Sequence, residues 1–173
     1  LVATPLLSGA FSDLASSLPS RMPFLVGRTI EGRILSRSRY RNAESFFLAI
    51  QELRFHNMGD LLYHTGIVVQ MALSSHLMDV GFDDRWCARN IGLHIDKGLA
   101  YANATGLNYR SPELERLATV LSPYNVWRDP DLHGSKPALP ASLPNIPPLL
   151  RDLLDHVRGV TGHPLPRRRK AHG

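Results

Sequence analysis

The sequence has only one cysteine, Cys87, and no long uninterrupted apolar run. A single cysteine excludes an internal disulfide and every metal cage built from several thiolates, and it fits a reducing compartment. A membrane-spanning helix requires roughly 18 or more consecutive apolar residues, and no segment approaches that length. We therefore expect a cytoplasmic protein that does not span a membrane.

Motifs that mark several enzyme classes are missing too. The sequence has no glycine-rich phosphate-binding loop, no nucleophile elbow and no cysteine pair. Its first ten residues lack the basic start of a secretion signal. The chain begins with Leu1 instead of methionine, and we expect it to be a fragment or a processed product.

The length and composition of the chain indicate one compact domain with a net positive charge. A chain of 173 residues, 43% of them hydrophobic, is long enough to bury a core. The formal net charge of +5 favours an anionic partner. The basic residues form two clusters, which are Arg28, Arg33, Arg37, Arg39 and Arg41, and the run Arg167, Arg168, Arg169 and Lys170. Nucleic acid is the partner that such clusters suggest, with Arg37, Arg39, Arg41 and the C-terminal run as contacts; a solvated surface and tail are the alternative.

Helical periodicity and capping residues predict the first helices. Residues 8–18 predict a short helix. Asn42 caps a predicted helix over residues 43–54, in which apolar residues repeat at helical spacing. Asn57 caps a longer predicted helix that ends near Gly81. These two helices form the first half of the expected core.

Similar signals predict the helices that follow. Asp83 or Asp84 opens a helix that closes by Gly106. Ser111 begins the sequence S-P-E, which combines a capping serine, a proline at the first helical position and an acid in the first turn. This combination predicts a helix that runs to about Leu121.

Other segments are irregular or weakly patterned. The mixture of Val, Ile, Thr and Gly in residues 24–35 favours an extended or hairpin segment. Residues 122–148 contain seven prolines and predict a loop or linker. Residues 149–158 predict a final amphipathic helix, and the chain after Gly162 is predicted to be an unstructured tail. The fold class is therefore mostly α, an irregular bundle of five or six helices.

These elements divide the chain into four predicted parts. They are an N-terminal helix and extended segment (1–41), a helical core (42–121), a proline-rich loop (122–144), and a C-terminal helix with a basic tail (145–173).

Two histidines are predicted to face the interior of the bundle. His64 lies on an apolar stripe with Val68 and Met71, and His94 shares its side with Ile91 and Tyr101. A buried polar group without a partner costs about 1–3 kcal/mol, so each ring needs a neighbour that satisfies it. Neutral imidazole binds zinc, iron or manganese well, so that neighbour is either a metal ion or a backbone carbonyl.

The segments around these histidines resemble the HD superfamily of metal-dependent phosphohydrolases. That family has a first histidine followed by an apolar run, then the pattern L-H-D-x-G-K, and a final aspartate further on. The stretch L-L-Y-H-T-G-I-V-V-Q-M-A-L matches the first segment at His64, and W-C-A-R-N-I-G-L-H-I-D-K-G is similar to the second at His94, 30 residues later. His56 is similar to an extra upstream histidine in the HD domains of some conjugative relaxases.

The resemblance implies an all-α domain that binds a divalent metal ion, one of Mn, Fe, Mg and Zn. The implied ligands are His56, His64, His94, Asp96 and Asp129. The metal would polarise the phosphoryl oxygen of a phosphate ester, in a phosphate-containing small molecule or a nucleic acid, and would acidify a bound water for attack on it. Asp96 and Lys97 would be catalytic, with Lys97 offsetting charge on the phosphate. Without activity, such a domain would be a binding module.

The second segment departs from the family pattern. Ile95 separates His94 from Asp96, and the chain reads K-G where the family reads G-K. In a regular α-helix two positions differ by about 200°, which places Asp96 on the face opposite His94. Gly92 and Gly98 leave open a bulge or an early helix end that brings the carboxylate back.

Two further functions stay open at this point. One is a non-enzymatic basic helical module that binds nucleic acid in a mobile-element context. The other is a structural subunit whose apolar stripes pack against a partner. The oligomeric state is open as well.

Three other polar features of the sequence can be interpreted from their neighbouring residues. His76 and Asp79 have i,i+3 spacing and are predicted to be a surface pair. Asp60 lies four residues before His64 and is predicted to bond its imidazole. Cys87 is predicted to be an inert packed thiol.

Overall fold

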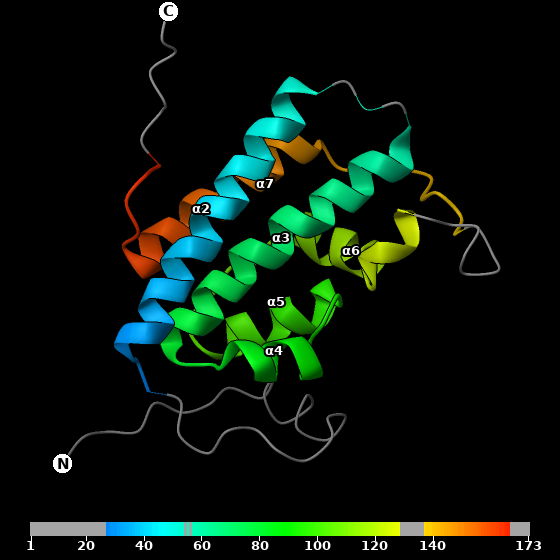
Figure 1. Ribbon diagram of the computed structural model, residues 1–173. Helices are drawn as coiled ribbons and strands as arrows, with labels where there is room; N and C mark the ends of the chain where they lie inside the picture. The colour runs from blue at the N-terminus through cyan, green and yellow to red at the C-terminus, as the bar shows by residue number, and fades with distance from the viewer. Residues whose placement is uncertain (1–26, 54, 56, 129–136, 167–173) are drawn as a thin grey trace, which may run out of the picture.

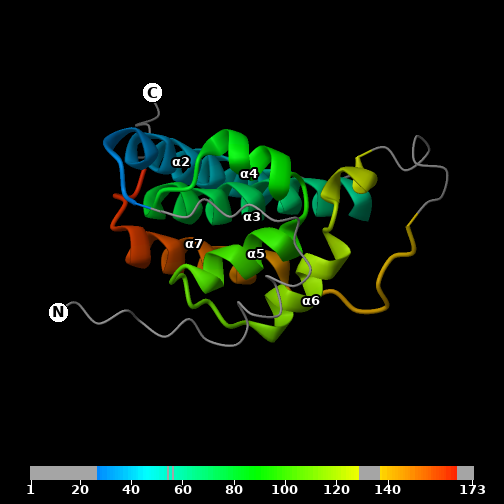
Figure 2. The same cartoon turned by 90° about the horizontal axis from the view of Figure 1, so that it is seen from below.

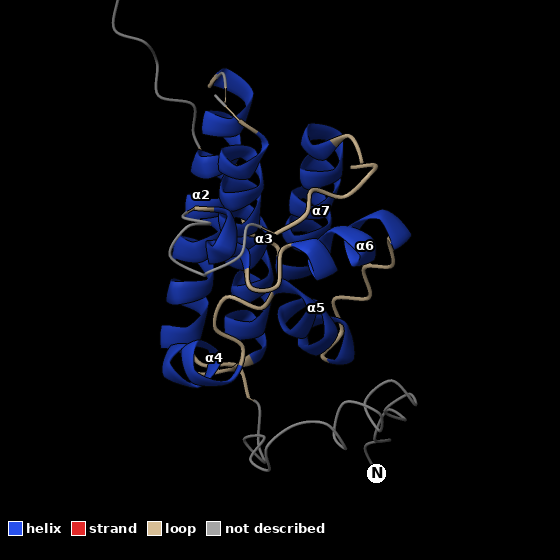
Figure 3. Cartoon of the chain, turned by 90° about the vertical axis from the view of Figure 1, so that its right-hand side faces the viewer, coloured by secondary structure: helices blue, strands red, loops and turns tan. Residues whose placement is uncertain are grey.

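The computed structural model describes residues 27–53, 55, 57–128 and 137–166. These residues form six α-helices and one short 3₁₀ helix, and no strand occurs among them (Figures 1 and 3). The predicted mostly α bundle is confirmed. No helix in this part of the chain has the length and apolar character that crossing a membrane requires. The elements are α2 (Ile30–Glu52), α3 (Met58–Val80), α4 (Asp84–Asn90), α5 (Ile95–Ala104), α6 (Pro112–Val120), η1 (Tyr124–Trp127) and α7 (Ile146–Thr161).

Helices α2 and α3 form an antiparallel pair and lie side by side (Figure 1). Each has 23 residues, which corresponds to a length of about 35 Å. In their contact, Ser36 Oγ donates to the main-chain oxygen of Ser75 at 2.6 Å, and Ser75 Oγ donates to that of Ser36 at 2.9 Å. Both serines are fully buried. These small, mutually bonded side chains let the two backbones approach closely with no polar atom left unpaired.

The start of α2 overturns the predicted extended or hairpin segment over residues 24–35. Residues 30–35 are helical, and Thr29 caps the helix by accepting the main-chain N–H of Gly32 at 2.9 Å. The aliphatic residues that suggested a strand lie on the solvent side of the helix, with Ile30 82% exposed. Asn42, the predicted cap, lies inside α2, so the boundary between 41 and 42 falls within a helix. Residues 24–26, like the predicted helix at 8–18, lie outside the described residues.

Helix α3 has the ends that the sequence predicts. The Asn57 side chain accepts the main-chain N–H of Asp60 at 2.9 Å, and Gly81 ends the helix with a left-handed φ of 114°. In the middle of α3, the backbone of Gly66 is covered by Tyr124 of η1. A Cβ atom at residue 66 would lie 2.3 Å from Cγ of Tyr124, so only glycine permits this contact. The tyrosine is buried there and donates from its hydroxyl to Oε1 of Gln70 at 2.6 Å.

The single helix predicted between Asp83 and Gly106 is in fact two helices. Asp83 caps α4 as expected, by accepting the main-chain N–H of Arg85 at 3.1 Å. The chain then turns at Gly92, whose φ is 58°, and α5 begins after His94. Glycine adopts this left-handed conformation without steric cost, which explains why the helix breaks at this point.

The last two helices complete the core. Ser111 caps α6 by accepting the main-chain N–H of Leu114 at 3.2 Å, as predicted. Helix α7 packs against both α2 and α3. Seen from below, α3 lies in the middle, with α2 and α4 on one side and α5, α6 and α7 on the other (Figure 2). The proline-rich predicted loop contains η1 and the first turn of α7, where Pro147 and Pro148 lie.

The chain stays ordered beyond the end of α7, so the predicted tail after Gly162 begins too early. His163 is only 4% exposed, and its Nε2 lies 2.6 Å from Oγ of Ser36. Figures 1 and 2 show this red segment beside the blue first half of α2. The C-terminal segment is therefore attached to the α2–α3 pair through a buried hydrogen bond.

Candidate functional site

His64, the first predicted metal ligand, bonds to the main chain of its own helix. Its Nδ1 lies 2.8 Å from the main-chain oxygen of Asp60, so Nδ1 carries the proton and donates. The half-buried ring packs against Phe55 and Tyr63, with ring centroids 5.2 and 5.5 Å away. The predicted interaction with Asp60 therefore involves its carbonyl and not its carboxylate.

The second predicted metal segment lies at the start of α5. His94 precedes the first turn of that helix, and Asp96 lies within it. The exposed Asp96 carboxylate accepts the main-chain N–H of Lys97 at 2.8 Å, and its own main-chain N–H donates to Ser122 Oγ at 2.9 Å. A carboxylate in the first turn stabilises a helix through its dipole, which is sufficient to account for this position.

The described residues contain no group of three or more histidine, cysteine, aspartate or glutamate side chains that could hold a metal ion. Two of the five predicted ligands, His56 and Asp129, lie outside the described residues. The metal centre therefore stays a prediction of the resemblance.

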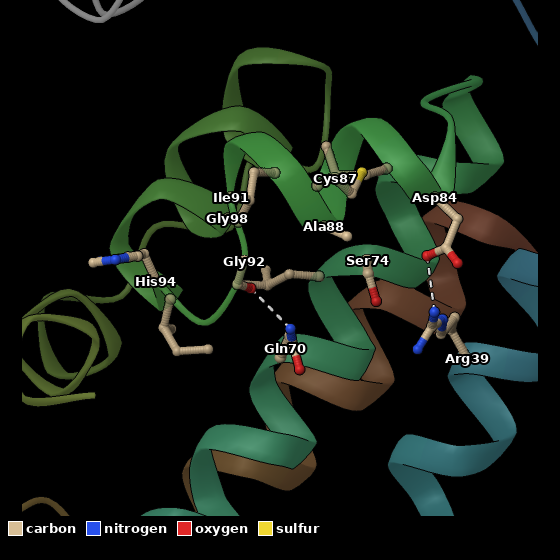
Figure 4. A pocket seen from close by; sticks show the side chains of 13 residues that line it. Arg39, Gln70, Ser74, Asp84, Cys87, Ala88, Ile91, Gly92, His94 and Gly98 are labelled. Atoms are coloured by element: carbon tan, nitrogen blue, oxygen red, sulfur yellow. Dashed lines mark hydrogen bonds and ion pairs between the residues drawn. The ribbon is translucent and has the colours of Figure 1, made fainter. Parts of the chain in front are cut away.

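A small pocket of about 90 Å³ lies between α2, α3, α4 and α5 (Figure 4). His94 lies at one edge of it, on the side opposite Arg39 and Asp84, which form an ion pair at 2.8 Å. Gln70 Nε2 donates across the pocket to the main-chain oxygen of Gly92 at 2.8 Å. Burial raises the pKa of the Cys87 thiol to about 12, so it stays protonated at neutral pH. Arg39, Asp84 and Gln70 are thus engaged by the fold itself, whereas the His94 ring forms no hydrogen bond with the described residues.

The predicted nucleic-acid contacts on α2 differ in their surroundings. Arg39 is held by Asp84 and by the Sδ of Met71, so its charge is partly neutralised. Arg37 and Arg41 are exposed, and their guanidinium groups form no ion pair within the described chain. They are four residues apart and therefore share one face of the helix. The run Arg167, Arg168, Arg169 and Lys170 lies outside the described residues.

A second, more open groove of about 320 Å³ lies between the first half of α2 and the segment after α7. This volume is at the lower end of the range for small-ligand pockets. Its described lining has no acidic side chain and consists of Ile30, Arg33, Ile34, Arg37, Gly162, His163 and Pro164. We refer to it as the α2–α7 groove.

The wall of the α2–α7 groove is built on a buried aspartate. Asp79 is 1% exposed, and its two carboxylate oxygens accept hydrogen bonds from Arg28 and Arg33. Arg33 Nη2 also donates to the main-chain oxygen of Thr161 at 3.1 Å, one of the carbonyls left free at the end of α7.

The prediction that His76 and Asp79 form a surface pair is wrong, because both side chains are 1% exposed.

Sequence periodicity gave no sign of this cluster. Asp79 is 51 residues from Arg28 and 46 from Arg33, and Ser36 is 127 residues from His163. The only local signal is Gly162, which ends α7 with a left-handed φ of 70° and turns the chain toward α2. Long-range pairings of this kind become visible only in the folded chain.

Two buried histidines are disfavoured in their charged form. Burial lowers the pKa of His76, whose Nε2 donates to Oγ1 of Thr105 while its Nδ1 is buried without a partner. Burial also lowers the pKa of His163; the Asp79 carboxylate opposes this change, whereas the positive charges of Arg33 and Arg37 add to it. Both imidazoles are therefore neutral at neutral pH.

The free energy of unfolding is expected to decrease as the pH falls below about 6.5, the pKa of an unperturbed histidine. Histidines with lowered pKa values bind fewer protons in the folded than in the unfolded state, so acid favours unfolding. Urea unfolding at pH 7.5 and pH 5.5 measures this change. The variant H76Q should show a smaller difference between the two pH values. Equal midpoints for the original chain at both pH values would contradict the expectation.

Comparisons of the chain with protein-family models, with curated proteins and with solved structures give no match. The functional interpretation therefore depends on the residues and their geometry.

Proposed function

We propose that this protein is a non-enzymatic, basic helical module that binds nucleic acid through the phosphate backbone. The observation that carries this proposal is the pair of exposed arginines, Arg37 and Arg41, on one face of α2 with no acidic partner in the described chain. Free arginines on a helix surface neutralise phosphates and release counterions, which supplies most sequence-independent binding.

The surroundings of these two arginines add further positive charge. Arg28 and Arg33 share a single carboxylate, that of Asp79, so one positive charge is left over beside Arg37. The C-terminal basic run follows directly in sequence on residue 166, the last described residue after His163. His163 is bonded to Ser36 of α2, so the described part of this segment lies beside the first half of α2.

Binding of single-stranded and duplex oligonucleotides is expected to weaken steeply between 50 and 200 mM salt, as counterion release requires. The double variant R37Q/R41Q should reduce the slope of log K against log salt by about 1 to 2, because each lost phosphate contact lowers it by about 1. Fluorescence anisotropy at four or more salt concentrations measures the slope.

The matched control is R116Q, which removes an exposed arginine from α6. In Figure 2, α6 lies on the other side of α3 from α2. This variant should leave the slope unchanged. Absence of binding at 50 mM salt, or equal slopes for R37Q/R41Q and R116Q, would falsify the proposed function.

A further inference from the structure

The α2–α7 groove combines positive charge with exposed apolar side chains. Arg33 and Arg37 line it together with Ile30 and Ile34, which are 82% and 64% exposed. These two exposed isoleucines are one helical turn apart and line the groove together with the two arginines. A ligand that satisfies this surface has an anionic group and a less polar part attached to it.

The surrounding fold holds Arg33 in place but leaves Arg37 without a hydrogen bond from the described residues. Arg33 is fixed by Asp79 of α3 and by the main-chain oxygen of Thr161, so it shapes the wall of the groove. Arg37 is exposed, and its guanidinium forms no hydrogen bond with the described residues. One arginine is thus held in place, while the other still has its full set of donors to offer.

His163 contributes a ring nitrogen at the same place. Its Nε2 is 2.6 Å from Ser36 Oγ, whereas its Nδ1 forms no hydrogen bond with the described residues. The side chain is 4% exposed and lines the groove. The charged groups that face it are Asp79 from α3 and Arg33 and Arg37 from α2. An anion in the groove would favour a proton on the free nitrogen, because opposite charges attract.

We propose that the α2–α7 groove binds the terminal phosphate of a phosphate monoester, with Arg37 as its main contact and the ester part lying over Ile30 and Ile34. The inference rests on the proposed function and makes it more specific, because the end of a nucleic-acid strand is one source of such a group. A free mononucleotide is the other source of the same chemistry.

The chemistry of the groove favours a monoester over a backbone diester. A terminal phosphate carries a charge of −1.5 to −2 at pH 7 and has three strong acceptor oxygens. A guanidinium group binds two of these oxygens at once, and the His163 ring, which lines the groove, would donate to the third once its free nitrogen is protonated. A backbone phosphate has a single charge and is substituted on both sides, so it uses fewer of these donors.

The test compares a 5′-phosphorylated with a 5′-hydroxyl oligonucleotide of the same sequence at one salt concentration. The original chain should bind the phosphorylated strand about tenfold more tightly, the effect expected of charge-assisted hydrogen bonds. The variant R37Q should bring the ratio of the two affinities to about one. The control R41Q, one turn further along α2 and outside the groove, should weaken both strands and keep the ratio.

A second measurement uses inorganic phosphate and does not depend on nucleic acid. Phosphate should raise the pKa of His163, followed by NMR of its imidazole protons, and R37Q should remove the change. The groove site is overturned if the two strands bind with equal affinity and phosphate leaves the pKa of His163 unchanged. Binding of both strands would still support the proposed function in that case. Binding of phosphate and mononucleotides without binding of either strand supports the groove and rejects the proposed function.

Discussion

Replacing Leu150 with alanine is expected to destabilise the folded protein by about 2–5 kcal/mol. Leu150 lies in the second turn of α7 and is 0% exposed within the main hydrophobic core. Helix α7 packs against both α2 and α3, so the neighbours of this side chain are not free to fill the space it leaves. The substitution therefore removes buried apolar surface and also leaves a cavity.

Urea unfolding followed by circular dichroism measures this difference. The matched control is L48A in α2, which makes the same substitution at a side chain that is 47% exposed. A surface position of this kind usually changes stability by about 0.5 kcal/mol or less. If L150A and L48A had the same effect, α7 would not be part of the core that holds α2 and α3.

Replacing Arg151 with methionine is expected to destabilise the protein by about 2–4 kcal/mol. Arg151 donates two hydrogen bonds to the buried carboxylate of Glu44, at 2.6 and 2.9 Å, and lies over the ring of Phe47. Breaking a fully buried pair costs about 3–5 kcal/mol, and we reduce this range because Arg151 is 34% exposed. Methionine keeps the apolar stem, so the loss reflects mainly the unpaired carboxylate of Glu44, with a smaller part from the exposed ion pair that Arg151 forms with Asp155 at 3.0 Å.

The pKa of Glu44 shows why this carboxylate needs its partner. Burial alone would raise that pKa, but hydrogen bonds from Arg151 and Tyr40 outweigh burial and lower it. Without Arg151, the carboxylate would stay buried with only the Tyr40 hydroxyl as a donor.

The double variant E44Q/R151M should recover part of the lost stability, since it leaves no buried charge. The control R158M, whose partner Asp155 is 48% exposed, should cost about 0–1 kcal/mol. The interpretation fails if R151M is no more destabilising than R158M, or if E44Q makes R151M worse.

Local signals predicted the helices whose ends depend on a few neighbouring residues. Asn57, Gly81 and Ser111 each act at the helix end where the sequence placed them. The start of α2 was missed because isoleucine and threonine favour strands, whereas here Thr29 caps a helix and Ile30 lies in solvent. The intrinsic preference of these residues for strands is weak, and it is overridden where the rest of the helix packs well and the isoleucine can remain in solvent.

The candidate site was harder to predict, because it depends on side-chain direction. His64 was expected to face the interior and to bond either a metal ion or a backbone carbonyl, and its half-buried ring donates to the carbonyl of Asp60. The break at Gly92 places His94 just before α5 and Asp96 in its first turn, so the two residues do not lie in the middle of one continuous helix as the sequence predicted. The resemblance to HD phosphohydrolases remains a prediction that a metal-binding measurement on the full chain can test.

The bare backbone of α3 at Gly66 links two positions that are 58 residues apart in the sequence. Tyr124 occupies the space in which a side chain at position 66 would lie. Evolution can therefore enlarge residue 66 only if residue 124 shrinks, and the two positions should covary among descendants of this chain. A glycine paired with an aromatic residue across that interval is thus a signature by which distant relatives could be recognised.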